Sequence, residues 1–126
     1  MDPKFSKITE DRRGTIFLVE GLLEDEKEFT FMEMKKGSAR GGCFHPKDEH
    51  FAVIKGKVRF ILGDEERVVS VGDSGKIPAM KSHAFIALED SIVSEWGITT
   101  AEKKANTKDS KLRAYLDETN KNNNFD

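Results

Sequence analysis

Residues 37–56 read G-S-A-R-G-G-C-F-H-P-K-D-E-H-F-A-V-I-K-G, and residues 72–87 read G-D-S-G-K-I-P-A-M-K-S-H-A-F-I-A. Glycine and proline separate short apolar runs in both stretches, which is typical of β-strands joined by tight turns. The first stretch also holds a cysteine, two histidines and two acidic residues, and the second holds one more histidine. These two stretches therefore indicate how the chain folds and where side chains able to bind a metal ion gather.

The sequence around these stretches continues the pattern of short strands. Seven runs rich in Val, Ile, Phe and Thr are predicted to be strands: 15–20, 28–34, 49–55, 57–62, 67–71, 83–88 and 91–95. Within 57–62, Val58, Phe60 and Leu62 alternate along the run, so they point to one face. Short strands at a spacing of about ten residues predict an all-β sandwich or barrel.

The C-terminal part of the chain has a different pattern. We expect residues 1–100 to form the barrel with its N-terminal strands, and residues 101–126 to form a C-terminal helix and a disordered polar tail. Leu112, Tyr115 and Leu116 follow helical spacing and predict a helix over 109–118. Asp109 or Ser110 is its candidate N-cap, and its apolar stripe is expected to pack on the outside of the barrel.

Composition limits the classes of function. The chain has 126 residues, enough for one domain, of which 37% are hydrophobic and 35% charged. No apolar run approaches the about 18 residues that a membrane span needs. The net charge of −2 argues against a nucleic-acid partner bound through a basic surface. Cys43 is the single cysteine, and the first residues lack the apolar segment of a secretory signal, so we expect a cytoplasmic protein.

Four side chains are candidates for a metal site. Cys43 and His45 lie two residues apart and share a face if they lie on one strand, and a turn then brings Glu49 beside them. His83 begins a later strand, and a closed barrel can place it on the same inner wall. Thiolate, imidazole and carboxylate together favour zinc or iron over magnesium or calcium. A second interpretation stays open, in which Cys43 is a small buried side chain and the pocket holds no metal.

The spacing of these residues resembles the two motifs of the cupin superfamily. Five positions carry the first motif: Gly37, Cys43, His45, Glu49 and Gly56. Cys43 stands where the family has its first histidine. The second motif matches at Gly72, Pro78 and His83, whereas Met80 and Ala87 replace a glycine and an asparagine. The resemblance covers residues 37–87 and implies a cupin-type jelly-roll barrel, also called a double-stranded β-helix.

The same resemblance implies a site and an assembly. The metal ligands would be Cys43, His45, Glu49 and His83, and they would hold a divalent metal, with zinc or iron favoured by the thiolate. Cupins commonly pair, so we expect a homodimer.

A finer resemblance links the chain to cupins that modify nucleotide sugars: dTDP-sugar 3,4-ketoisomerases, 3,5-epimerases and the cupin domain of capsular-polysaccharide reductases. It rests on residues 11–62, chiefly Asp11-Arg12-Arg13-Gly14 and Arg40-Gly41-Gly42-Cys43-Phe44-His45. It implies an isomerase or epimerase whose small-molecule substrate is a sugar or sugar nucleotide. His45 and His83 would be catalytic and move a proton, and Arg40 would bind an anionic group of the substrate. Cys43 occupies the position of the base expected in those enzymes.

Two other functions are compatible with the same residues. One is a non-catalytic cupin that binds a ligand or a metal as a sensor or accessory protein. The other is a metal-dependent oxygenase or decarboxylase of a small carboxylic acid. Arg40 also has a second interpretation, as one half of a salt bridge at a surface or an interface.

Overall fold

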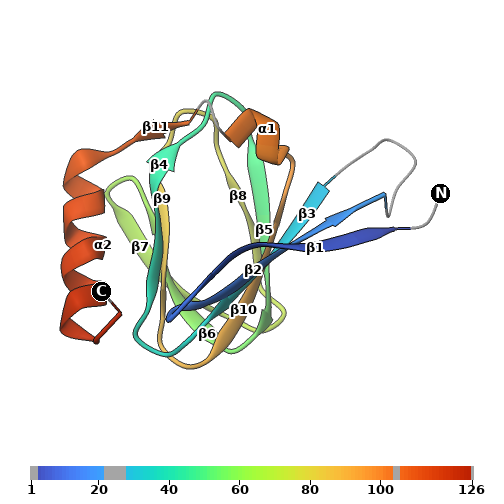
Figure 1. The fold of residues 1–126 in the computed structure, drawn as a ribbon. Helices are drawn as coiled ribbons and strands as arrows, with labels where there is room; N and C mark the ends of the chain where they lie inside the picture. Colours follow the sequence, from blue (N-terminus) through green and yellow to red (C-terminus); the bar gives the residue numbers. More distant parts are fainter. Residues whose placement is uncertain (1–2, 22–27, 104–105, 126) are drawn as a thin grey trace.

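The computed structural model describes residues 3–21, 28–103 and 106–125, and its strands form two facing antiparallel sheets (Figure 1). The first sheet has the order β1 (Lys4–Asp11), β2 (Gly14–Glu20), β3 (Glu28–Met34), β10 (Ser91–Trp96), β5 (Glu49–Lys55) and β8 (Ser74–Ile77). The second has the order β11 (Thr107–Lys108), β4 (Ala39–Phe44), β9 (His83–Ala87), β6 (Lys57–Leu62) and β7 (Glu65–Ser70). From β3 onward the chain crosses repeatedly between the sheets, which confirms the predicted jelly-roll barrel.

The predicted strands agree closely with the observed ones where the sequence is apolar. β3, β5 and β6 have the predicted bounds, β2, β9 and β10 differ by one residue at one end, and β7 differs by one or two residues at each end. The sequence does not predict β1, β4, β8 or β11. β1 is a polar edge strand that pairs only with β2. In β4, Gly41 and Gly42 lower the strand propensity, but Gly41 is required because a Cβ there would lie 2.7 Å from the His83 carbonyl oxygen.

Aromatic side chains fill one end of the barrel. Phe51, Phe60 and Phe85 are at most 2% exposed, and their ring centroids lie 4.5–5.3 Å apart. Burying each ring contributes about 1.5–3 kcal/mol, so this cluster stabilises the barrel. Glu49 lies two residues before Phe51 on β5, and His83 lies two residues before Phe85 on β9. Because side chains alternate along a strand, each polar residue is on the same face as its phenylalanine. The barrel therefore has an apolar end and a polar end.

Helix α2 (Ser110–Asn122) packs on the outside of the second sheet, as predicted. Its N-cap is Asp109, one of the two candidates, and the Asp109 carboxylate accepts a hydrogen bond from the Leu112 N–H at 3.0 Å. Leu116 packs on an apolar cluster of Ala39, Ile61, Ala84 and Ile86. The helix extends beyond residue 118, and the buried Asn120 side chain hydrogen-bonds both the N–H and the C=O of Ala39, at 2.7 and 3.0 Å.

Two short elements lie at the polar end of the barrel, after β10 and before α2 in the sequence. They are the single-turn helix α1 (Thr100–Lys103) and β11, which pairs with Phe44 and Cys43 on β4 (Figure 1). Both elements consequently lie beside the polar cluster. Among the described residues, no helix is both long enough and apolar enough to cross a membrane.

Candidate metal centre

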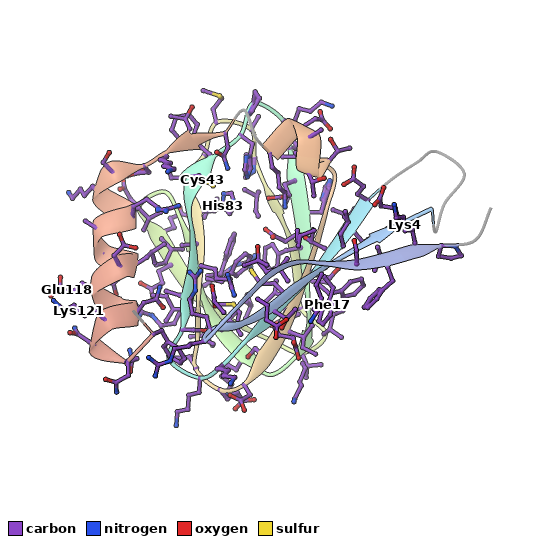
Figure 2. The ribbon with its side chains drawn as sticks, viewed as in Figure 1. Lys4, Phe17, Cys43, His83, Glu118 and Lys121 are labelled. Carbon is purple, nitrogen blue, oxygen red and sulfur yellow. The ribbon has the colours of Figure 1, made fainter. Side chains whose placement is uncertain are left out.

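The polar cluster is assembled from the ends of neighbouring strands. β4 and β9 pair with Cys43 opposite His83, and both side chains lie at the polar end of the barrel (Figure 2). His45 directly follows β4, and Glu49 begins β5. Glu95 lies on β10, which pairs with β5. The structure thus brings together the four ligands predicted from the sequence and adds Glu95, which the sequence analysis did not include.

Two overlapping groups of donor atoms have the spacing of metal ligands. One is the thiol–imidazole set (Cys43, His45 and His83), the other is the carboxylate set (Glu49, His83 and Glu95), and within each set the donor atoms lie within 4.8 Å of one another. The Glu49 Oε1 atom is 3.7 Å from Nε2 of His45 and 3.6 Å from Nε2 of His83. These distances exceed a hydrogen bond, and Glu49 Oε1 is buried without a hydrogen-bond partner. A divalent ion between these atoms would satisfy them, so the residues present fit the metal that the motif implies.

Both histidines are held in the neutral form that binds metals. His45 and His83 are only 4% and 3% exposed. Burial, together with the neighbouring His83 and Lys103, lowers the pKa of His45 to about 4. Burial also lowers the pKa of His83. A neutral imidazole has a free ring nitrogen for a metal ion, so the electrostatics of the cluster agree with its geometry.

A lysine neutralises the buried carboxylates. Lys103 Nζ lies 3.0 Å from Glu49 Oε2 and 3.7 Å from Glu95 Oε1. Burial and the nearby Glu95 carboxylate raise the pKa of Glu49. Burial alone would favour a neutral amine at Lys103, but attraction to Glu95 and Glu49 outweighs it and raises the lysine pKa. The centre therefore contains a built-in positive charge.

Sequence reasoning missed Glu95 and Lys103 for different reasons. Glu95 follows Val93 at strand spacing on a predicted strand, so its inward-facing position was a usable signal. Lys103 lies on a helix of one turn that has no apolar periodicity, and no sequence signal places its side chain over the barrel end.

Cys43 is a thiol rather than an activated base in the metal-free protein. Burial, with the nearby Glu95 and Glu49 carboxylates, raises the pKa of Cys43. The Asn106 side-chain amide donates a hydrogen bond to the sulfur at 3.5 Å. A thiol in this environment becomes a thiolate when a metal displaces its proton, so the chemistry favours a ligand role.

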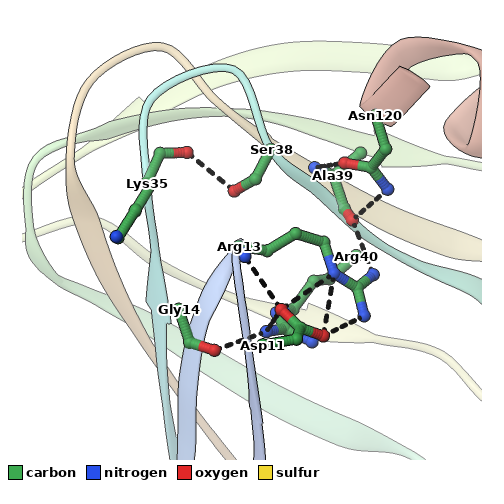
Figure 3. A network of polar contacts seen from close by, with 8 residues as sticks. All are labelled: Asp11, Arg13, Gly14, Lys35, Ser38, Ala39, Arg40 and Asn120. Atoms are coloured by element: carbon green, nitrogen blue, oxygen red, sulfur yellow. Dashed lines mark hydrogen bonds and ion pairs between the residues drawn. The ribbon is translucent and has the colours of Figure 1, made fainter. Parts of the chain in front are cut away.

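Arg40 links the cluster to the turn between β1 and β2. Its guanidinium lies 3.2 Å from the Asp11 carboxylate and donates to the Gly14 carbonyl at 3.0 Å (Figure 3). Arg13 pairs with the same carboxylate at 2.7 Å. Arg40 is 6% exposed. Arg40 thus forms a salt bridge, but a buried one rather than one at a surface, and its Nε atom has no hydrogen-bond partner.

The five side chains Cys43, His45, Glu49, His83 and Glu95 are called the metal-ligand cluster here, as candidates for that role. A cavity of about 280 Å³ joins Arg40 to this cluster. Cys43, His45, His83 and Glu95 line it from the barrel interior. Its positively charged lining residues are Arg13, Arg40, Lys103 and Arg113. The cavity therefore combines metal-binding donors with cationic groups suited to an anionic ligand.

The sequence profile of the Cupin domain family matches residues 30–96. This match covers more than half of the chain, and the protein therefore belongs to the cupin family. No curated protein sequence matches the chain.

Solved structures with this fold share little sequence identity with the chain. KdgF from Halomonas sp. is 22% identical with a TM-score of 0.59, covering 72% of this chain and 84% of that one. A cupin-2 domain protein from Shewanella frigidimarina is 19% identical with a TM-score of 0.53, covering 61% and 74%. Oxalate decarboxylase from Bacillus subtilis, a protein with Mn(II) centres, is 18% identical with a TM-score of 0.63, covering 82% and 30%. The similarity is one of fold, and this chain matches under a third of oxalate decarboxylase.

Proposed function

We propose that this cupin binds a divalent metal through Cys43, His45, Glu49 and His83 and isomerises or epimerises a sugar or sugar nucleotide. The supporting observation is that Cys43 and two neutral imidazoles line a cavity with four cationic side chains, and that the buried Glu49 carboxylate lies beside these imidazoles. A metal ion bound there would act as a Lewis acid toward a substrate oxygen.

The side chains would have different roles in binding the metal, moving the proton and binding the substrate. His45 and His83 would both be able to hold the ion, and whichever of them has a ring nitrogen not bound to it would take the proton from the substrate, because burial keeps both imidazoles neutral. Arg40 lines the cavity, and its guanidinium would bind an anionic or carbonyl oxygen of the substrate. Cys43 serves as a ligand, because its raised pKa does not suit a base.

The size of the cavity limits the part of the substrate that enters it. Its volume of about 280 Å³ lies just below the range of about 300–1,000 Å³ typical of sites for drug-sized ligands. A single sugar ring suits this volume better than a whole nucleotide sugar. We therefore place the reacting sugar inside the cavity and any nucleotide outside it.

Solvent-deuterium exchange tests this function. The metal-loaded protein is incubated in D2O with a panel of small sugars, sugar acids and nucleoside-diphosphate sugars, and NMR is used to detect deuterium next to a carbonyl. We expect exchange in at least one compound, loss of exchange in His45→Ala, and exchange retained in His50→Ala, whose histidine stacks on Trp96 instead. No exchange and no change in melting temperature with any compound would contradict the proposal.

A second candidate is a decarboxylase or oxygenase of a small carboxylic acid. The observation that favours it is the cationic lining of a small cavity, which complements a carboxylate. The same incubations separate the two reactions, since a decarboxylase releases CO2 and an oxygenase consumes O2. Binding of a compound without any of these reactions would instead support a non-catalytic sensor or accessory protein.

We also propose that the protein forms a homodimer through the β1 side of the first sheet. β1 is an edge strand, and Phe5 on it is 66% exposed although its ring stacks on Phe17 at 5.1 Å. An open strand edge beside an exposed aromatic ring favours pairing with a second copy.

A further inference from the structure

Lys103 is the last residue of α1, and its side chain reaches the metal-ligand cluster from that helix. Its side chain is 24% exposed, and its ammonium contacts both members of the buried carboxylate pair, Glu49 and Glu95. The position of α1 is fixed by contacts that do not involve Lys103. Thr99 and Glu102 cap the helix reciprocally, with hydrogen bonds of 3.1 Å from each backbone N–H to the other side chain.

Two further contacts hold α1 to the barrel. The Glu28 carboxylate accepts hydrogen bonds from the Thr100 N–H at 3.1 Å and from its hydroxyl at 2.9 Å. Lys47 forms an ion pair with Glu102. Lys103 therefore lies on a helix that is anchored on both sides, and this helix holds its side chain toward the cluster.

The ammonium contacts only one part of the donor cluster. Glu49 Oε2 pairs with Lys103, whereas Glu49 Oε1 faces the two histidines at 3.6 and 3.7 Å. Glu95 also faces Lys103. The lysine therefore engages the carboxylate set and leaves the thiol–imidazole set, together with one oxygen of Glu49, available to a metal.

The two donor sets prefer different ions. Thiolate and imidazole suit zinc, whereas carboxylate oxygens suit harder ions such as Mn2+. An ammonium and a divalent ion compete for the same carboxylate charge, because each carboxylate can be neutralised by either cation. An ion that depends on Glu95 and on the second oxygen of Glu49 must therefore displace Lys103, whereas an ion held by Cys43, His45, His83 and Glu49 Oε1 need not.

We propose that Lys103 determines the metal selectivity of this centre, by occupying the Glu49–Glu95 carboxylates and so favouring zinc over manganese. The inference rests on the metal site of the proposed function. It assigns to Lys103 a positioning role toward the ligands and no contact with the substrate.

Metal affinities of three proteins test the inference. Dissociation constants for Zn2+ and Mn2+ are measured by chelator competition on metal-free wild type, Lys103→Met and Lys76→Met. Lys76 pairs with Asp48 at 3.1 Å, so its variant also loses a cation from an ion pair close to Glu49 in sequence. We expect Lys103→Met to bind Mn2+ at least about tenfold more tightly relative to Zn2+ than wild type does. Lys76→Met should keep the wild-type ratio.

The outcomes distinguish a failure of this inference from a failure of the proposed metal site. An unchanged ratio of the two affinities in Lys103→Met, with metal bound by both proteins, overturns the inference alone. Absence of metal binding by wild type and variant overturns the metal site and the inference together. If Lys103→Met does not fold, the double variant Lys103→Met/Glu95→Gln is used instead and compared with Glu95→Gln. The double variant removes one buried negative charge together with the cation. We expect the same shift in the ratio of Mn2+ to Zn2+ affinity between these two variants, now through Glu49 alone. If the ratio is the same in both variants, the inference is overturned.

Discussion

His45 and His83 are unusual because each is buried with its Nδ1 atom lacking a hydrogen-bond partner. A buried polar atom without a partner costs free energy, so neither residue is placed there for stability in the metal-free state. At the scale of single residues, the polar end of the barrel holds two buried imidazoles at a cost in stability.

The lowered pKa of His45 predicts a pH dependence of stability in the metal-free protein. The unfolded histidine takes up a proton near pH 6.5, whereas the folded one resists protonation until about pH 4. Between these values the unfolded state binds more protons, so stability falls as the pH falls, by at most about 1.4 kcal/mol per pH unit from this residue.

The comparison with His45→Gln isolates this effect. We expect the stability of wild type relative to the variant to decrease as the pH is lowered from 6.5 to 4, measured by urea unfolding of the metal-free proteins. A difference that stays constant across this range would show that the folded His45 is not resisting protonation.

The sequence predicts most of the site at this scale, and the missing residues have physical explanations. Cys43, His45, Glu49 and His83 were predictable because two short motifs fix their spacing on strands. Glu95 comes from a strand far along the chain and meets them only through the pairing of β10 with β5. Lys103 depends on how one turn of helix is anchored over the barrel, which is decided by tertiary contacts.

At the scale of elements, α2 is held to the sheet by a polar anchor as well as by its apolar stripe. The sequence predicts the stripe from Leu112 and Leu116, but composition places Asn120 in a polar tail. In the structure, Asn120 is 7% exposed and bonds both backbone groups of Ala39. A lone polar residue gives no periodic signal, so this anchor could not be predicted from the sequence.

Removal of this anchor should destabilise the protein measurably. Asn120→Ala leaves the buried Ala39 N–H without its side-chain partner, and we expect a loss of about 1–3 kcal/mol in the free energy of unfolding. The control is Asn122→Ala, which changes an exposed asparagine of the same helix and should stay within about 0.5 kcal/mol of wild type. Denaturant unfolding measures both, and equal stabilities of the two variants would refute the anchoring role.

At the scale of the whole molecule, the barrel separates its apolar core from its polar cluster. Phenylalanine packing fills one end, and the metal-ligand cluster with its cavity occupies the other. The β1 side of the first sheet carries an exposed aromatic ring on a strand at the edge of the sheet. This arrangement leaves that side free for self-association.

The proposed homodimer makes a prediction at this scale. Light scattering coupled to size-exclusion chromatography should give twice the chain mass for wild type. Phe5→Glu places a charge in the proposed interface and should yield monomers, whereas Val68→Glu, at an exposed position on β7 of the other sheet, should remain dimeric. A monomeric wild type, or a dimeric Phe5→Glu protein, would contradict the proposed interface.

The most direct test of the account is the metal content of the purified protein. Elemental mass spectrometry is applied to wild type, His83→Ala and the control His50→Ala after reconstitution with zinc or iron. His83 belongs to both donor sets, whereas His50 stacks on Trp96 away from them. We predict about one ion per chain in wild type and His50→Ala and a severe loss in His83→Ala. No metal in wild type, or the same metal content in His83→Ala, would contradict the proposed centre.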